Sequence, residues 1–251
     1  MNPAPPGRLM ILSGPSCVGK SPLANALSLH YPELWEGLTQ LVLYNDRDPR
    51  PGEQDGVQYH FRSREEIEAL KEKNDFLVID VRGDLQALDV TELHRLLSQG
   101  NVFYEGNPFI ATRMMSEPSL QAIDRLTVFM APLARAEILA LKSARPPVNL
   151  QEIVADVMRR KLLRRTQKQK GEISLPDLEN IERRASSAYQ ELQFAHHFQH
   201  VIPNHDGEDS ENWDAFYHPL GDARKALLDV AALLQGETPT WTESWEETLL
   251  S

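Results

Sequence analysis

The chain of 251 residues contains one cysteine, Cys17, so it has neither an internal disulfide nor a zinc site built from several cysteines. A single unpaired thiol is compatible with a reducing compartment. No apolar run approaches the roughly 18 residues that a membrane-spanning helix needs, and the first residues lack the apolar stretch of a secretory signal peptide. These absences predict a cytoplasmic protein without a membrane partner.

Positive charge is also scarce. Lysine and arginine number 26 against 37 aspartates and glutamates, which gives a formal net charge of −11. Because general nucleic-acid binders need positive surface to meet the phosphates, we expect no nucleic-acid partner. Hydrophobic residues make up 41% and charged residues 25%, close to ordinary globular usage, and so predict a folded chain.

Short apolar runs alternate with segments of helical pattern. Strands are predicted at residues 9–12, 41–44, 76–81, 101–104, 126–130 and 201–202. Helices are predicted over residues 23–29, 63–73, 91–98 and 223–234, and over most of 133–192. This alternation predicts an α/β fold whose parallel sheet is covered by helices on both faces. We expect residues 1–7 to form a flexible arm, and 236–251 an acidic tail that is mobile or docked through Trp241 and Trp245.

The sharpest motif follows the first predicted strand. It fits the pattern G-x-x-x-x-G-K-[ST] and consists of Gly14, Pro15, Ser16, Cys17, Val18, Gly19, Lys20 and Ser21. The two glycines let the backbone curl so that its amides point at phosphate oxygens. Lys20 would neutralise the outer phosphates, and the Ser21 hydroxyl is a ligand for Mg²⁺. The motif therefore predicts an ATP-binding loop with Lys20 as a catalytic cation and Ser21 on the metal.

A second anion site is predicted in the loop after residues 41–44. Arg47 and Arg50 lie three residues apart on a proline-stiffened loop, where two guanidinium groups can converge on one phosphate. Glu53 is placed to orient a guanidinium, and Tyr59 to add a hydroxyl. From these residues alone, the alternative is a solvated, turn-rich loop with surface ion pairs.

Together the two motifs resemble those of the guanylate kinase family, S-G-P-S-G-x-G-K-S and R-x-P-R-x-G-E-x-D-G-x-x-Y-x-F. Residues 13–21 match the first with Cys17 in place of glycine, and residues 47–61 match the second in full. Weaker similarity covers residues 181–192 and 201–204. The resemblance implies a P-loop NTPase-type three-layer sandwich over residues 8–235, with an acceptor-binding region at about 41–90 and a helical lid at about 134–180.

The resemblance also implies a role for each matching residue in an ATP- and Mg²⁺-dependent phosphotransferase. The phosphate of the acceptor would be held by Arg47, Arg50, Glu53 and Tyr59. Arg165 and Arg184 would act as catalytic cations at the transferring phosphoryl group, and Asn204 would lie near the adenine of ATP.

The groups with which the family reads guanine are missing. An acidic residue is expected on the strand at residues 76–81, but the two possible alignments place Val78 or Leu77 there, and Asp80 fits only after a shift. Residues 85–88 replace the family's Y-Y-G-[ST]. Glu105 is the candidate replacement for the family's magnesium-organising D-x-D segment, or else an unrelated strand-end carboxylate.

These losses predict a phosphorylated small-molecule acceptor that is not GMP, because a base-reading site rejects ligands that leave its polar groups unpaired. Two alternatives stay open. One is a genuine guanylate kinase with non-standard base contacts, and the other is a non-catalytic guanylate-kinase-like binding module.

Residues 159–170 contain seven cations and no acid. The family resemblance implies a mobile lid that brings arginines to ATP. A solvated helix face balanced by nearby acids is a second interpretation, and a nucleic-acid arm is a third.

Overall fold

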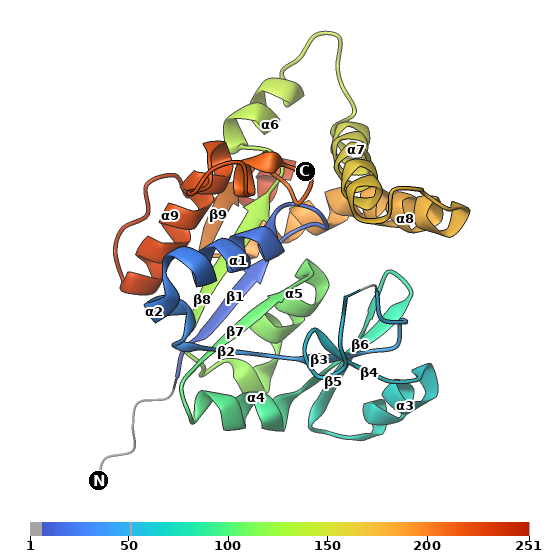
Figure 1. Ribbon diagram of the computed structural model, residues 1–251, viewed down its shortest axis with the longest axis vertical. Helices are drawn as coiled ribbons and strands as arrows, with labels where there is room; N and C mark the ends of the chain where they lie inside the picture. Colours follow the sequence, from blue (N-terminus) through green and yellow to red (C-terminus); the bar gives the residue numbers. More distant parts are fainter. Residues whose placement is uncertain (1–6, 51, 251) are drawn as a thin grey trace. The chain divides into compact units, whose positions relative to one another are not determined.

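The computed structural model describes residues 7–50 and 52–250, so the predicted arm lies outside the described residues except for Gly7. The strands form two sheets (Figure 1), a five-stranded sheet of order β2-β7-β1-β8-β9 and a four-stranded sheet of order β4-β3-β6-β5. The pairs β2–β7 and β8–β9 are parallel. This confirms the predicted α/β fold with a parallel sheet, and it adds a second sheet that was not predicted.

The chain divides into two units. The first comprises residues 1–11, 37–105 and 109–126, and the second comprises residues 12–36, 106–108 and 127–251. Strand β1 (Leu9–Ser13) begins in the first unit and ends in the second. Its five residues are all buried, as its uninterrupted apolar run predicts.

The first unit contains the four-stranded sheet and the helices near it. Its elements are β2 (Leu38–Gln40), β3 (Leu43–Asn45), β4 (Tyr59–Phe61), α3 (Arg64–Ala69), β5 (Phe76–Val81), β6 (Asp84–Asp89), α4 (Val90–Leu97), β7 (Asn101–Gly106) and most of α5 (Pro108–Ser116). Helix α3 begins at the predicted capping box, in which Ser63 and Glu66 each accept a hydrogen bond from the other's backbone amide. The strand predicted at residues 41–44 is shifted toward the C-terminus. It comprises Leu43–Asn45, the residues that pair with the neighbouring strands.

The two faces of the four-stranded sheet have different surroundings. On one face Tyr44 and Val78 pack with Leu85, Ala87 and Ile67 of α3 in a small hydrophobic core. Because side chains alternate along a strand, the neighbouring residues of each strand point to the opposite face. The strand pairing places these neighbours on that opposite face: Leu43, Asn45, Tyr59, Phe61, Leu77, Ile79 and Gln86.

The second unit contains the remaining helices. Its elements are α1 (Lys20–His30), α2 (Pro32–Trp35), most of β8 (Arg125–Ala131), α6 (Arg135–Lys142), α7 (Leu150–Lys170), α8 (Leu175–Gln193), β9 (His200–Pro203) and α9 (Gly221–Gln235). Helices α7 and α8 pack against each other. The first is capped by Asn149 and ends at Gly171, whose φ of 77° lies in the left-handed region that favours glycine.

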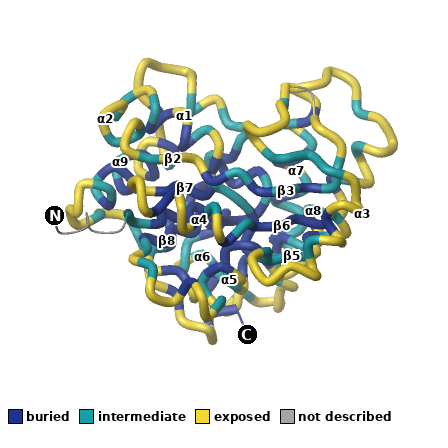
Figure 2. Tube along the Cα trace, turned by 90° about the horizontal axis from the view of Figure 1, so that it is seen from below, coloured by how far each residue is buried: buried dark blue, intermediate teal, exposed yellow. Residues whose placement is uncertain are grey.

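Burial follows the strands in this unit. Residues 126–131 of β8 are buried and are dark blue in Figure 2. The segment after α9 packs on the unit, because Trp245 is only 6% exposed and Glu243 exchanges two backbone hydrogen bonds with Val201 at 2.8 and 2.7 Å. Trp241, by contrast, is exposed. Within the described residues, none of the helices combines the length and apolar character required to span a membrane.

Candidate functional site

The phosphate loop, residues 14–21, lies between β1 and α1 as its motif predicts. Its backbone needs glycine at two positions. Gly14 has a φ of 146°, and a Cβ there would lie 2.4 Å from the Met130 carbonyl oxygen. Gly19 has a φ of 104°, and a Cβ there would lie 2.6 Å from Nδ2 of Asn204. Any larger residue would therefore force the loop open.

The side chain of Lys20 is hydrogen-bonded to the backbone of this loop. Lys20 is the first residue of α1 and only 7% exposed. Its Nζ donates hydrogen bonds to the carbonyl oxygens of Gly14 at 2.9 Å and Pro15 at 2.8 Å. The ammonium is thus held over the loop, where a phosphate would meet it. Ser21 follows in the first turn of α1 and is exposed.

Cys17 adopts a left-handed φ of 66° in this loop and has no exposed surface. Burial, with a further contribution from the negative charge of Glu208, raises the pKa of its thiol to about 12. Since the thiolate is the reactive form, we expect no reaction of the native protein with iodoacetamide at pH 8. After denaturation one thiol per chain should react, as counted by mass spectrometry. Labelling of the native protein would contradict the buried position.

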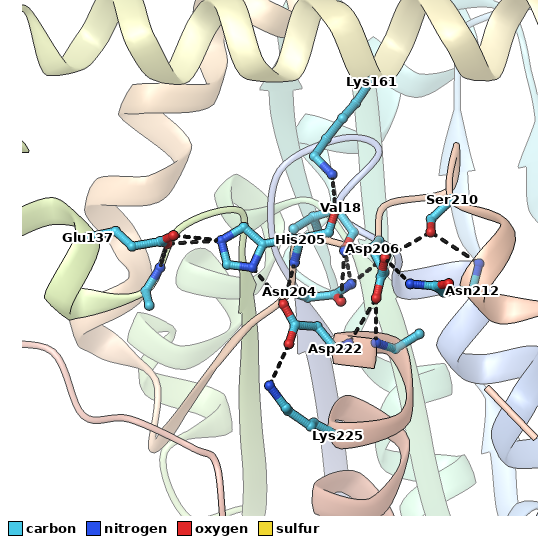
Figure 3. A network of polar contacts seen from close by, with 12 residues as sticks. Val18, Glu137, Lys161, Asn204, His205, Asp206, Ser210, Asn212, Asp222 and Lys225 are labelled. Carbon is cyan, nitrogen blue, oxygen red and sulfur yellow. Dashed lines mark hydrogen bonds and ion pairs between the residues drawn. The ribbon is translucent and has the colours of Figure 1, made fainter. Parts of the chain in front are cut away.

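Asn204 fastens the phosphate loop to the segment after β9 (Figure 3). Its Nδ2 donates to the carbonyl oxygens of Val18 at 2.8 Å and Asp206 at 2.7 Å. The residue has no exposed surface. Through these bonds Asn204 has a structural role, because it joins the phosphate loop to the segment after β9. Its contact with adenine stays a prediction.

The segment after β9 is an acidic loop, residues 205–211, and its polar groups are closely paired. The Asp206 carboxylate accepts hydrogen bonds from the Ser210 hydroxyl and from the amides of Asp222 and Ala223 at the start of α9, at 2.9 to 3.1 Å. Figure 3 shows His205 between two carboxylates, with Nδ1 at 2.6 Å from Asp222 and Nε2 at 2.9 Å from Glu137. These partners outweigh burial and raise the pKa of His205.

Arg165 of α7 meets this acidic loop at Glu208. The guanidinium Nη1 lies 2.7 Å from Oε2 of Glu208, and the two side chains are 14% and 17% exposed. The Nε of Arg165 is buried and has no hydrogen-bond partner within the part of the chain that the structure describes. Burial alone would raise the pKa of Glu208, but the charges of Arg165, Lys20 and Arg184 lower it below its ordinary value. Arg165 thus contacts a carboxylate that sequence reasoning did not single out, and the charges of Lys20 and Arg184 also act on that carboxylate.

Most of the other cations of residues 159–170 also have acidic partners. Arg159 makes two hydrogen bonds to Glu182 of α8, at 2.7 and 2.8 Å. Arg160 pairs with Asp156, and Arg164 with Asp209 at 3.4 Å. Lys161 is buried and donates to the carbonyl oxygen of His205. Nearby acids therefore compensate this helix, and Lys161 and Arg165 bind it to the acidic loop.

In the first unit, Glu53 organises the loop of the second motif. Its two carboxylate oxygens accept hydrogen bonds from Nη1 and Nη2 of Arg47, both at 2.7 Å, and Oε2 also accepts from the Arg50 amide at 2.8 Å. The Arg47 guanidinium lies 5.2 Å from the ring centre of Tyr59 and 5.4 Å from that of Phe61. Arg47 is therefore fixed in one orientation, whereas Arg50 is exposed.

Tyr59 lies among several charges of the same unit. Burial raises the pKa of its phenol, Arg47 and Arg82 lower it, and Glu105 and Glu53 raise it further, so that the net shift is upward. Tyr59 is consequently a neutral hydrogen-bond donor at pH 7. The predicted metal ligand Glu105 is one of the charges that act on this phenol.

Comparisons with known proteins agree with these motifs. A family model described as guanylate kinase matches residues 6–103. The guanylate kinase of Synechococcus sp. (strain JA-3-3Ab) is 34% identical over 137 residues, which are 54% of this chain and 60% of that protein. The guanylate kinase of Corynebacterium diphtheriae is 29% identical over 205 residues, 81% of this chain and 90% of that protein.

The extent of these similarities varies. The chain spans only about three fifths of several relatives, for example 59% of the guanylate kinase of Rhodococcus jostii (strain RHA1), to which it is 35% identical over half of its own length. The crystal structure of guanylate kinase from Anaplasma phagocytophilum superposes with a TM-score of 0.53 at 15% identity, over 92% of this chain and 86% of that one, and so has the same fold. In its motifs, its fold and these relatives, the chain is similar to guanylate kinases.

Proposed function

We propose that the protein is an ATP-dependent phosphotransferase that moves the γ-phosphoryl group of ATP to a phosphorylated small molecule other than GMP. The observation that carries the proposal is the intact phosphate loop, with Lys20 bonded to two of its carbonyl oxygens and the Arg165–Glu208 pair on the segment that packs against it. A binding module that does not transfer phosphate needs no buried lysine held over such a loop.

In this proposal the second unit binds ATP and the first unit binds the acceptor. An acceptor oxygen attacks the γ-phosphorus, the bond to the bridging oxygen of ADP breaks, and ADP leaves with that electron pair. Lys20, Arg165 and Arg184 neutralise the charge that develops on the transferred group. Arg47, held by Glu53, and the Tyr59 hydroxyl position the acceptor's phosphate.

Mg²⁺ is expected to arrive with ATP. Magnesium prefers oxygen ligands and keeps several waters, so that one or two protein oxygens and the phosphates suffice. Ser21 in the exposed first turn of α1 and Glu105 at the end of β7 offer such oxygens. Among the described residues, no group of three or more histidines, cysteines or acids forms a metal cage, which fits a metal carried by the nucleotide. When bound, Mg²⁺ would neutralise charge on the phosphates.

The side chains of the first unit argue against GMP. Val78 packs in the hydrophobic core beneath α3, so it lies on the face of the sheet away from Arg47. Leu77, the other aligned residue, lies on the Arg47 face and is apolar. Asp80 lies on the Val78 face, and its Oδ1 accepts a hydrogen bond from the amide of Gly83 at 2.8 Å. Strand β5 therefore offers no carboxylate to a guanine base.

A phosphate-transfer screen tests the proposal. ATP and Mg²⁺ are incubated with nucleoside monophosphates, sugar phosphates and other phosphate esters, and ADP release is measured. We expect turnover with a phosphate ester other than GMP, and at least about 100-fold lower kcat/KM with GMP, the difference that two lost hydrogen bonds to a base produce. Efficient use of GMP would make the protein a genuine guanylate kinase. ATP binding without transfer to any acceptor would favour the binding module.

A further inference from the structure

Glu208 pairs with Arg165, one of the cations that the proposed function assigns to the phosphates of ATP. Its carboxylate is 2.7 Å from Arg165, in a pair whose side chains are 14% and 17% exposed. Lys20 and Arg184 also stabilise its negative charge, and its charge in turn acts on the Cys17 thiol inside the loop. Of the three cations that the proposed function assigns to ATP phosphates, Arg165 is thus already paired with a carboxylate, and the charge of that carboxylate also acts on the other two.

The backbone that carries Glu208 packs directly on the phosphate loop. A Cβ on Gly207 would lie 2.3 Å from the carbonyl oxygen of Cys17, which is a contact only glycine allows. On its other side, the carbonyl oxygens of Asp206 and Gly207 accept hydrogen bonds from Nε1 of Trp213 at 2.8 and 3.0 Å. The fold therefore holds the backbone next to Glu208 against the phosphate loop.

We infer that Glu208 is an internal competitor for the polyphosphate of ATP, whose carboxylate must leave Arg165 before the phosphates can bind. The inference rests on the proposed ATP site. Like charges in a desolvated site repel strongly, so a carboxylate and a phosphate that need the same donors of a cation compete for them. The unpaired Nε of Arg165 shows that its guanidinium still has a buried donor to offer. A phosphate group has more oxygens than a carboxylate, so it accepts hydrogen bonds from more of the N–H groups of the guanidinium.

The other possible task for Glu208 is to position Arg165 while phosphate binds beside it, as Glu53 holds Arg47. The two tasks predict opposite results for Glu208→Gln. A competitor that loses its charge lets ATP bind more tightly, whereas a positioning residue that loses its charge weakens ATP binding. Glu208 also differs from Glu53 in the cations that its charge affects. Glu208 acts on Lys20 and Arg184 as well as Arg165, while Glu53 is bonded to Arg47 and to the Arg50 backbone.

The test is the dissociation constant of ATP with Mg²⁺, measured by calorimetry and therefore independent of any acceptor. We expect Glu208→Gln and Glu208→Ala to bind ATP at least about tenfold more tightly than the native protein, a change of about 1.4 kcal/mol. Glu211→Gln is the matched control, because it removes the same charge from an exposed position of the same acidic loop and should change binding less than about twofold. Circular dichroism verifies that each variant is folded.

Tripolyphosphate, which lacks adenosine, serves as a second probe and separates this inference from the proposed function. Unchanged or weaker ATP binding by both Glu208 variants overturns the inference and leaves the ATP site standing. Tighter binding of tripolyphosphate by these variants, with no ATP binding by any protein, supports the inference and overturns the proposed function. Failure of both probes to bind any variant overturns both.

Discussion

Lys20→Ala is expected to abolish phosphoryl transfer while leaving the protein folded. The ammonium of Lys20 is the cation held over the phosphate loop, by hydrogen bonds of 2.8 and 2.9 Å to two of its carbonyl oxygens. Removing one such preorganised charge from a desolvated site lowers kcat by about 10³-fold or more. ADP release, measured with the acceptor that the screen identifies, gives the rate.

Two variants control this experiment. Lys20→Met keeps the buried stem of the side chain and removes only the charge, so it separates catalysis from packing; we expect the same loss of turnover and a smaller change in melting temperature than in Lys20→Ala. Lys71→Ala removes an exposed lysine and should leave turnover unchanged. Transfer at the native rate by Lys20→Ala would show that the phosphate loop is not the site of chemistry.

The phosphate loop, with the strand before it and the helix after it, was predictable because its signals are local. An apolar run followed by two glycines, a lysine and a hydroxyl residue defines strand, loop and helix within about 15 residues. The same holds for α3, whose capping box lies within residues 63–66. In such segments the hydrogen bonds that define the structure join residues close in sequence, so the sequence contains the information.

The four-stranded sheet was less predictable because pairing partners define it. Strand β4 has only three residues and pairs with β3 across 16 positions, Leu43 with Tyr59. Strand β6 follows the turn at Arg82 and Gly83. It matched no strand prediction, because its polar and apolar residues do not alternate strictly. The pairing register settles which face of β5 lies toward Arg47, and no local pattern in residues 76–81 contains that information.

Glu208 illustrates the same limit within the site. Residues 205–211 are acidic, and their sequence does not indicate what they pack against. Their position against the phosphate loop comes from contacts distant in sequence: Asn204 with Val18, Lys161 with His205, and Arg165 with Glu208. A carboxylate becomes part of a cation site only when such contacts bury it, and that step belongs to tertiary structure.

Arg47→Met is expected to have the second largest effect, on the acceptor alone. The Arg47 guanidinium is bound by both oxygens of Glu53 at 2.7 Å, and the two side chains are 13% and 17% exposed. The variant loses a forked donor to phosphate and leaves a half-buried carboxylate that repels the acceptor. Losing a close, partly buried charge contact lowers kcat/KM for the acceptor by about 100-fold or more, while KM for ATP should stay within about twofold.

The paired variant Arg47→Met with Glu53→Gln tests the cause. If the uncompensated Glu53 carboxylate produces part of the loss, removing its charge should restore about tenfold in kcat/KM and should also restore part of the unfolding free energy, of which Arg47→Met loses about 1–3 kcal/mol. Arg62→Met is the control, because Arg62 belongs to the same region and pairs with the exposed Asp55. A rise in KM for ATP equal to that for the acceptor would contradict the separate assignment of Arg47 to the acceptor.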